Sequence, residues 1–167
     1  LQGKQLINLD SEDDGQVFIG CAGGIDTLAK MHYEAKEHPM MQASSGTPLR
    51  LAIHIKVGGL MGGHSGDDIN KGRGNANKIL VRFLYQLLPF NIQLSTIKGG
   101  NLRNAIAREA EAVIAIPMAY KEDIRVMLNH YIATIESEIG DVEKDFFMTL
   151  ETTDMPELFI PEAEAKR

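Results

Sequence analysis

Aliphatic and polar residues alternate in the stretch 49–57, where leucine, isoleucine or valine occupies every second position. This period of two predicts a strand that buries one face. After a glycine-rich loop, the hydrophobic residues of 76–88 recur at helical spacing until Pro89 ends the run. The pattern therefore predicts a strand, a loop over residues 58–74 and an amphipathic helix, in that order.

The same patterns predict the elements that follow. Strands are expected at 91–97, 112–116 and 146–150, and a helix with a buried stripe from Ile124 to Ile135 and a C-terminal cap at Gly140. Residues 49–151 then have the order βαββαβ. This order predicts an α+β, ferredoxin-like fold, in which two helices pack on one face of a four-stranded antiparallel sheet.

The first 48 residues carry weaker patterns. Residues 5–9 and 17–20 are predicted as short extended segments on either side of an acidic turn at 10–15. The stretch 25–35 fits a helix or a strand, and we favour a strand. The chain does not begin with methionine and ends in a helix-prone stretch, so both ends are expected to be cut from a longer protein.

Composition and charge exclude several classes of function. The chain has 167 residues, of which 44% are hydrophobic, and this is enough for the core of one domain. A net charge of −6 without clustered lysine and arginine argues against nucleic-acid binding. No apolar run is long enough to span a membrane. The single cysteine, Cys21, cannot form an internal disulfide and favours a cytoplasmic location.

The loop 58–74 is the most informative segment because seven of its residues are glycine. Glycines allow a backbone to approach a ligand closely or to take a positive φ, although a flexible loop without a ligand is an equal alternative. The loop lacks the Lys-Ser/Thr pair of a phosphate-binding P-loop. In a Gly-x-Ser-x-Gly nucleophile motif around Ser65, Asp67 replaces the last glycine.

His64 lies among these glycines, so nothing in the local sequence buries its imidazole. Such a ring is suited to stabilising a developing oxyanion or to accepting a substrate proton. A surface histidine without a role is the alternative. Asp67 and Asp68 are candidates to orient the ring or to cap the following helix, and we favour capping for at least one of them.

A second polar loop, 99–109, separates two predicted strands. Asn104 is a candidate to bind a carbonyl or carboxylate group, and Arg103 or Arg108 a substrate carboxylate. A hairpin whose polar groups face water is the alternative. The acidic run at 10–15 imitates the start of a calcium-binding loop, but Cys21 stands where the closing glutamate belongs. One carboxylate at this strand end is still a candidate zinc ligand for a site completed elsewhere.

Four segments of the chain resemble the aminoacyl-histidine dipeptidases, which are cytosolic bacterial zinc dipeptidases of the Xaa-His or carnosinase-like type. The segments are INLDSEDDG, GCAGG, GGLMGGHSGDDINKGRGNANK and GGNLRNAIARE. The resemblance implies a zinc-binding catalytic domain and an inserted, ferredoxin-like lid domain that dimerises. Residues 1–20 are then expected to be a remnant of the catalytic domain and its linker. Residues 21–167 are expected to be the lid, with its core at about 49–151 and its C-terminal part missing.

The resemblance also implies roles for individual residues. Asp10 is expected to bind zinc, and Asn104, with Arg103, to contact the dipeptide substrate. His64 is expected to reach the active site of the partner subunit of a homodimer and to stabilise the tetrahedral intermediate there. The other zinc ligands, the general base and the substrate arginine of that family have no counterpart in this chain. The longer parent is therefore expected to be a cytoplasmic metallo-dipeptidase, whereas this fragment is expected neither to hold Zn2+ nor to be active alone.

Two other interpretations stay open. A small ferredoxin-like module can bind an amino acid at the loop after its first strand, here residues 58–74, without a metal, and would then act in regulation. A purely structural dimer interface is the second. No nucleic-acid or membrane partner is expected in any of these cases.

Overall fold

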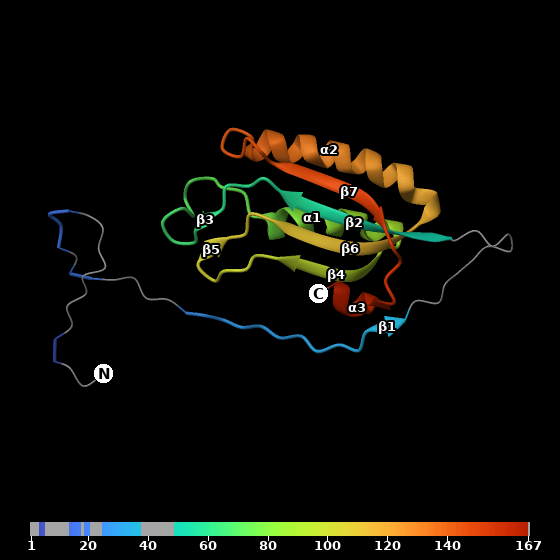
Figure 1. Cartoon of the computed structure of the whole chain (residues 1–167), viewed down its shortest axis with the longest axis horizontal. Coiled ribbons are helices and arrows are strands. Elements are labelled where there is room, and N and C mark those ends of the chain that lie inside the picture. Colours follow the sequence, from blue (N-terminus) through green and yellow to red (C-terminus); the bar gives the residue numbers. More distant parts are fainter. Residues whose placement is uncertain (1–3, 6–13, 18, 21–24, 38–48, 167) are drawn as a thin grey trace. The chain divides into compact units, whose positions relative to one another are not determined.

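The computed structural model describes residues 4–5, 14–17, 19–20, 25–37 and 49–166 (Figure 1). The predicted zinc ligand Asp10 and the single cysteine Cys21 lie outside these ranges, as does most of the strand predicted at 5–9. The chain divides between Met31 and His32 into two units. The second unit contains every helix and strand described below.

The segment 25–35 has no regular secondary structure, so the strand favoured for it is wrong. The first strand, β1, is only Lys36–Glu37, and it pairs antiparallel with β8, Leu158–Phe159. Ile25 and Leu28 are 94% and 79% exposed. Without a buried face, alternating hydrophobic residues have nothing to fix the register of a strand.

The main sheet has four strands, all antiparallel to their neighbours. The central strand β2, Arg50–Gly58, pairs on one side with β6, Ala110–Pro117, and on the other with β7, Phe147–Thr153. The strand β4, Gln93–Gly99, lies at the edge beyond β6. The order β4-β6-β2-β7, with one helix after β2 and one after β6, is the ferredoxin-like arrangement, and this prediction is confirmed (Figure 1).

Both helices pack on the same face of this sheet. The helices are α1, Ala76–Leu87, and α2, Lys121–Ile139, and short 3-10 turns occupy Leu88–Phe90 (η1) and Met118–Tyr120 (η2). Their buried residues form one core with the alternating residues of the two central strands, which are Leu51, Ile53, Ile55, Val57, Ala110, Ala112, Ile114 and Ile116. The strict alternation in β2 therefore has a direct cause, since one face meets the helices.

The ends of the helices correct one detail of the sequence analysis. Asn75 caps α1, and its side chain accepts a hydrogen bond from the Lys78 N–H at 3.2 Å. The capping role favoured for Asp67 or Asp68 is therefore wrong, because the loop continues past both residues before the helix begins. Gly140 caps α2 as predicted and donates its N–H to the Glu136 carbonyl, with a right-handed φ of −61°.

Two very short strands join the loops at one end of the sheet. β3, Gly63–His64, pairs antiparallel with β5, Ala105–Ile106. The chain ends in a short helix α3, Glu162–Ala165. No helix in the described part of the chain combines the length and the hydrophobicity needed to cross a membrane.

Candidate functional site

The two unusual loops predicted from the sequence meet in space. His64 pairs with Ala105 in the β3–β5 ladder, and the Ser65 N–H donates to the Asn104 carbonyl at 2.8 Å. The loops lie together at the end of the sheet where β2 and β4 meet them (Figure 1). This pairing places His64 beside the Asn104 segment, although the two residues are far apart in the sequence.

A cleft of about 770 Å3 opens between these loops and the ends of the sheet strands. His64 and Asn104 both line it, together with the cations Lys56, Lys98 and Arg108. Arg103 is exposed beside Asn104 and is not among the lining residues, so Arg108 is the loop arginine that faces the cleft. Glu109 and Glu111 also line the cleft, which therefore contains charges of both signs.

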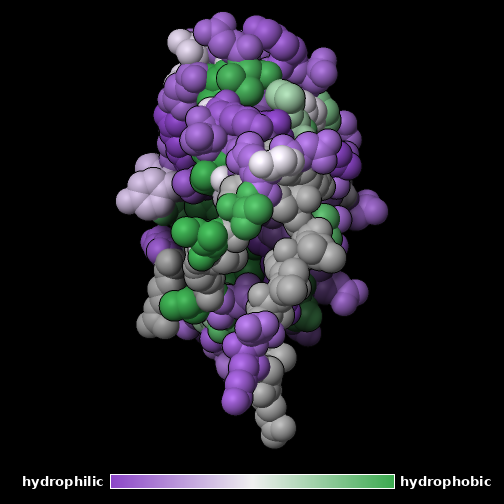
Figure 2. Space-filling view, turned by 90° about the vertical axis from the view of Figure 1, so that its left-hand side faces the viewer, coloured by the Kyte–Doolittle hydropathy of each residue, from purple (hydrophilic) through white to green (hydrophobic). Residues whose placement is uncertain are grey.

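The surface at this end mixes hydrophobic and polar groups. Figure 2 is turned so that the left-hand side of Figure 1 faces the viewer, and it shows hydrophobic residues in green among hydrophilic ones in purple. The loops carry three large hydrophobic side chains that are more than half exposed, namely Met61, Ile69 and Leu102. Exposed apolar side chains around a cleft are typical of a surface that meets a ligand or another protein surface.

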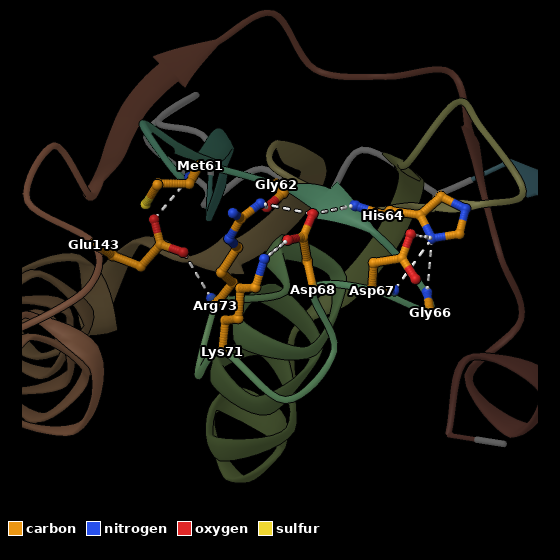
Figure 3. A network of polar contacts seen from close by, with 10 residues as sticks. Met61, Gly62, His64, Gly66, Asp67, Asp68, Lys71, Arg73 and Glu143 are labelled. Atoms are coloured by element: carbon orange, nitrogen blue, oxygen red, sulfur yellow. Dashed lines mark hydrogen bonds and ion pairs between the residues drawn. The ribbon is translucent and has the colours of Figure 1, made fainter. Parts of the chain in front are cut away.

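The His64 imidazole is oriented by the backbone of its own loop. Its Nδ1 accepts hydrogen bonds from the N–H groups of Gly66 and Asp67, both at 3.2 Å (Figure 3). A ring nitrogen that accepts cannot carry the proton, so the neutral ring is protonated on Nε2. The ring therefore presents an N–H donor on its far side, and half of its side chain is exposed.

The Asp67 carboxylate competes for the same nitrogen. Its Oδ2 lies 3.4 Å from His64 Nδ1 and would attract a proton there. The backbone hydrogen bonds need an unprotonated Nδ1, whereas an ion pair with Asp67 needs a protonated one. The backbone hydrogen bonds are favoured because their N–H groups are fixed by the turn, whereas the Asp67 side chain is 88% exposed and its attraction is weakened by water.

Asp68 fixes the backbone of His64 itself. Its Oδ2 accepts the His64 N–H at 2.7 Å and lies 3.0 Å from Arg73 Nη1, while its Oδ1 accepts from Lys71 Nζ at 2.7 Å (Figure 3). The hydrogen bond from Lys71, the one from the His64 backbone and the charge of Arg73 lower the pKa of this carboxyl, while burial opposes them. Asp68 is therefore a charged anchor for the residue that carries the imidazole.

Arg73 completes this network by donating from Nη1 to the Gly62 carbonyl at 2.6 Å. Gly63 lies between these contacts with φ of 137°, and a Cβ there would collide with Arg73 Nη1 and Asp68 Oδ2. Only glycine fits this position. The glycines of the loop thus allow charged side chains to close around the backbone on which His64 stands.

A metal site is not formed by the residues that the structure describes. Within them no group of three or more histidine, cysteine, aspartate or glutamate side chains could hold a metal ion. The sequence analysis named Asp68 as a candidate to orient the His64 ring, and the structure shows Asp68 holding the His64 backbone. It missed the anchoring role of Arg73 and that of Glu143, which binds the loop from a distant segment. A lone glutamate after a helix gives no local signal of such a contact.

Comparison with known proteins places this arrangement in a family. The family model described as the peptidase dimerisation domain matches residues 55–143, which is more than half of the chain. The chain belongs to the peptidase dimerisation domain family. Within this domain, the matched range contains the β2 strand from Ile55, the His64 loop, both main helices and Glu143.

Individual relatives agree with this assignment. The chain is 39% identical over 153 residues to the cytosol non-specific dipeptidase of Escherichia coli (strain K12), and the match covers 91% of the chain and 30% of that protein. The structure of aminoacylhistidine dipeptidase from Vibrio alginolyticus matches 80% of the chain and 26% of its own, with a TM-score of 0.70 and 30% identity. The chain thus spans less than a third of the length of these relatives.

A more distant structure shares the fold alone. An amidase of the hydantoinase/carbamoylase family from Burkholderia multivorans matches 70% of this chain and 30% of its own. Its TM-score is 0.50 and its identity 15%. The structural similarity supports the βαββαβ arrangement, but at an identity this low it carries nothing about the substrate.

Proposed function

We propose that this chain is the lid and dimerisation part of a cytoplasmic zinc dipeptidase that hydrolyses Xaa-His-type dipeptides. In this proposal the chain forms a homodimer, and His64 stabilises the tetrahedral intermediate in the active site of the partner subunit. The family match and the two dipeptidase relatives support the assignment to a peptidase. The division into a catalytic remnant at 1–20 and a lid at 21–167 belongs to the same proposal.

The observation that carries the catalytic part is the orientation of the His64 ring. Nδ1 accepts from two backbone N–H groups, so the neutral imidazole offers its Nε2–H to a group outside the loop. An amide bond under attack by water develops negative charge on its carbonyl oxygen. A fixed N–H donor beside that oxygen stabilises the transition state more than the ground state, and this lowers the barrier.

Polar groups of the same cleft are suited to hold the rest of a dipeptide. The Asn104 side chain is proposed to bind a carbonyl or carboxylate of the substrate, with Arg103 nearby in the same loop. Arg108, which lines the cleft, is an alternative partner for a substrate carboxylate. Binding at one end of the dipeptide would orient its amide bond toward the His64 donor.

The zinc ion of this proposal is assigned to parts of the enzyme other than the described residues, which form no metal site. Asp10 is proposed as one of its ligands on the strength of the family resemblance alone. No step of the mechanism above depends on the geometry of the metal. The role of His64 follows from its Nε2–H and is testable by itself.

The first experiment replaces His64 by alanine in the full-length peptidase that carries this chain. The kcat is expected to fall about 100-fold or more, the usual effect of removing one oxyanion donor. His130→Ala removes an exposed histidine of α2 and serves as the control. Turnover unchanged in His64→Ala would leave this region with a purely structural role in the dimer.

A second experiment tests donation between subunits. His64→Ala and Asp10→Ala enzymes are each expected to be inactive, and mixing them allows subunits to exchange. If His64 acts on the partner, each mixed dimer has one complete site, and about a quarter of the wild-type activity returns at equal mixing. If His64 acts within its own subunit, every site lacks one group and no activity returns.

A further inference from the structure

Glu143 is a buried carboxylate that the function proposed above does not use. It lies between α2 and β7 and is only 2% exposed. Its Oε2 accepts the Met61 N–H and its Oε1 accepts the Gly74 N–H, both at 2.7 Å (Figure 3). The two donors lie near the opposite ends of the glycine-rich loop, so one side chain joins both ends.

The chemistry of Glu143 makes a simple packing role a poor explanation. A buried carboxylate is costly unless hydrogen bonds or charges compensate it. Among the described residues no cation pairs with Glu143, and its two backbone partners provide the compensation. Those N–H groups, in turn, lie outside the helices and sheet ladders, and without the carboxylate they would lose their acceptor.

The two N–H contacts lie next to the network that holds His64. Met61 immediately precedes Gly62, whose carbonyl accepts from Arg73, and Gly74 immediately follows Arg73. Fixing Met61 and Gly74 therefore fixes both chain segments that Arg73 connects. Gly62 and Gly63, with φ of 67° and 137°, would otherwise leave this backbone free to take many conformations.

We propose that Glu143 is a positioning residue for His64, acting by joining the two ends of the glycine-rich loop. The carboxylate restricts the loop to one closed arrangement, and Arg73 and Asp68 then fix the His64 backbone within it. Through this sequence of contacts, α2 and β7 determine where the imidazole lies. The catalytic consequence rests on the function proposed above, whereas the effect on the loop does not.

The first test measures the loop directly. Glu143→Gln keeps the size of the side chain and one acceptor oxygen but turns an NH2 group toward the other backbone donor, so one hydrogen bond is lost. By NMR-detected hydrogen exchange, the amide of Met61 or Gly74, or both, should exchange roughly 10- to 100-fold faster. Glu136→Gln makes the same chemical change on the exposed surface of α2 and should alter neither rate. Unchanged exchange in Glu143→Gln would overturn the proposal.

The second test asks whether Glu143 acts through His64. In the full-length peptidase, Glu143→Gln should lower kcat about tenfold with little change in KM, because the donor is misplaced relative to the reacting oxygen. In the His64→Ala background, the same substitution should have no further effect on kcat. A further tenfold loss in the double variant would overturn the positioning role and leave the role of His64 intact.

The two proposals fail in different ways. If His64→Ala alone left kcat unchanged, the proposed function would be wrong, and the exchange rates would still report on the loop.

Should Glu143→Gln fail to fold, the unaltered chain supplies the test. A carboxylate that joins both ends predicts that the Met61 and Gly74 amides open together, with opening constants within about a factor of two. Opening of one amide without the other would contradict the proposal.

Discussion

Replacing His64 by asparagine or by glutamine separates the two nitrogens of its imidazole. An asparagine oxygen can occupy the place of Nδ1 and accept the Gly66 and Asp67 N–H groups, but it leaves nothing at Nε2. A glutamine nitrogen can reach the place of Nε2 and donate there, but it gives up the Nδ1 acceptor. The pair therefore distinguishes the outward donor from the contact that orders the turn.

The structure allows the two losses to be compared. The bonds to Nδ1 are long, at 3.2 Å, and exposed, so each contributes at the lower end of about 0.5–1.5 kcal/mol. Losing both costs about 1 kcal/mol, so the fraction of correctly positioned side chains falls about fivefold. Removing an oxyanion donor from a closed site costs about 10²–10³ in kcat, or roughly 2.7–4 kcal/mol. Because losing the donor costs more than losing the Nδ1 contacts, His64→Gln should retain more activity than His64→Asn, by about an order of magnitude.

The assay is kcat on a dipeptide substrate at saturation in the full-length peptidase, with circular dichroism to confirm that both variants fold. An asparagine variant at least as active as the glutamine variant would refute the reasoning, because activity would then follow the Nδ1 contact. Equal and nearly complete loss in both would mean that the imidazole acts through a property neither amide shares. Proton exchange with the substrate would be such a property.

Two further predictions concern stability, measured by urea unfolding of the chain. Gly59→Ala should lower the free energy of unfolding by roughly 3 kcal/mol or more, because φ is +75° and a Cβ would overlap the Asp145 carbonyl oxygen. Gly72→Ala is the matched control: its φ is +70° but the nearest neighbour of a Cβ would lie at 3.8 Å, so it should lower this free energy by only about 1 kcal/mol. Tyr131→Phe should cost about 1 kcal/mol by removing the hydrogen bond from its hydroxyl to the Ile79 carbonyl. Burial raises the pKa of Tyr131 to about 12, so this group favours folding below pH 10 and loses that contribution as the pH rises through 12. Tyr131→Phe should remove this part of the alkaline destabilisation, and an unchanged alkaline profile would contradict the assignment.

The fold could be predicted from the sequence because its elements have strong local periodicity. The alternation from Leu51 to Val57 and the helical spacing in α1 both report a single buried face, and the structure confirms both. In the stretch 25–35, Ile25 and Leu28 are exposed and no regular secondary structure forms, so the strand favoured there is wrong. Periodicity indicates that one face of a segment is apolar. The segment forms regular secondary structure only where another element covers that face.

The cap of α1 shows a second limit. Asp67, Asp68 and Asn75 are all residue types that cap helices, and the sequence does not distinguish them by type alone. Asn75 caps α1 because the helix begins at Ala76, whereas Asp68 lies within the loop and binds Lys71, Arg73 and the His64 backbone. The choice depends on where the folded loop ends and the helix begins.

What the sequence alone determined is the succession of elements and the presence of an unusual loop bearing His64, since both follow from residue types and spacing. Only the tertiary structure decided that the two loops pair and that Glu143 joins the loop ends. These features depend on contacts between residues far apart in the chain. Folding selects such contacts through the packing of the whole domain, and no local pattern of hydrophobic or polar residues records them.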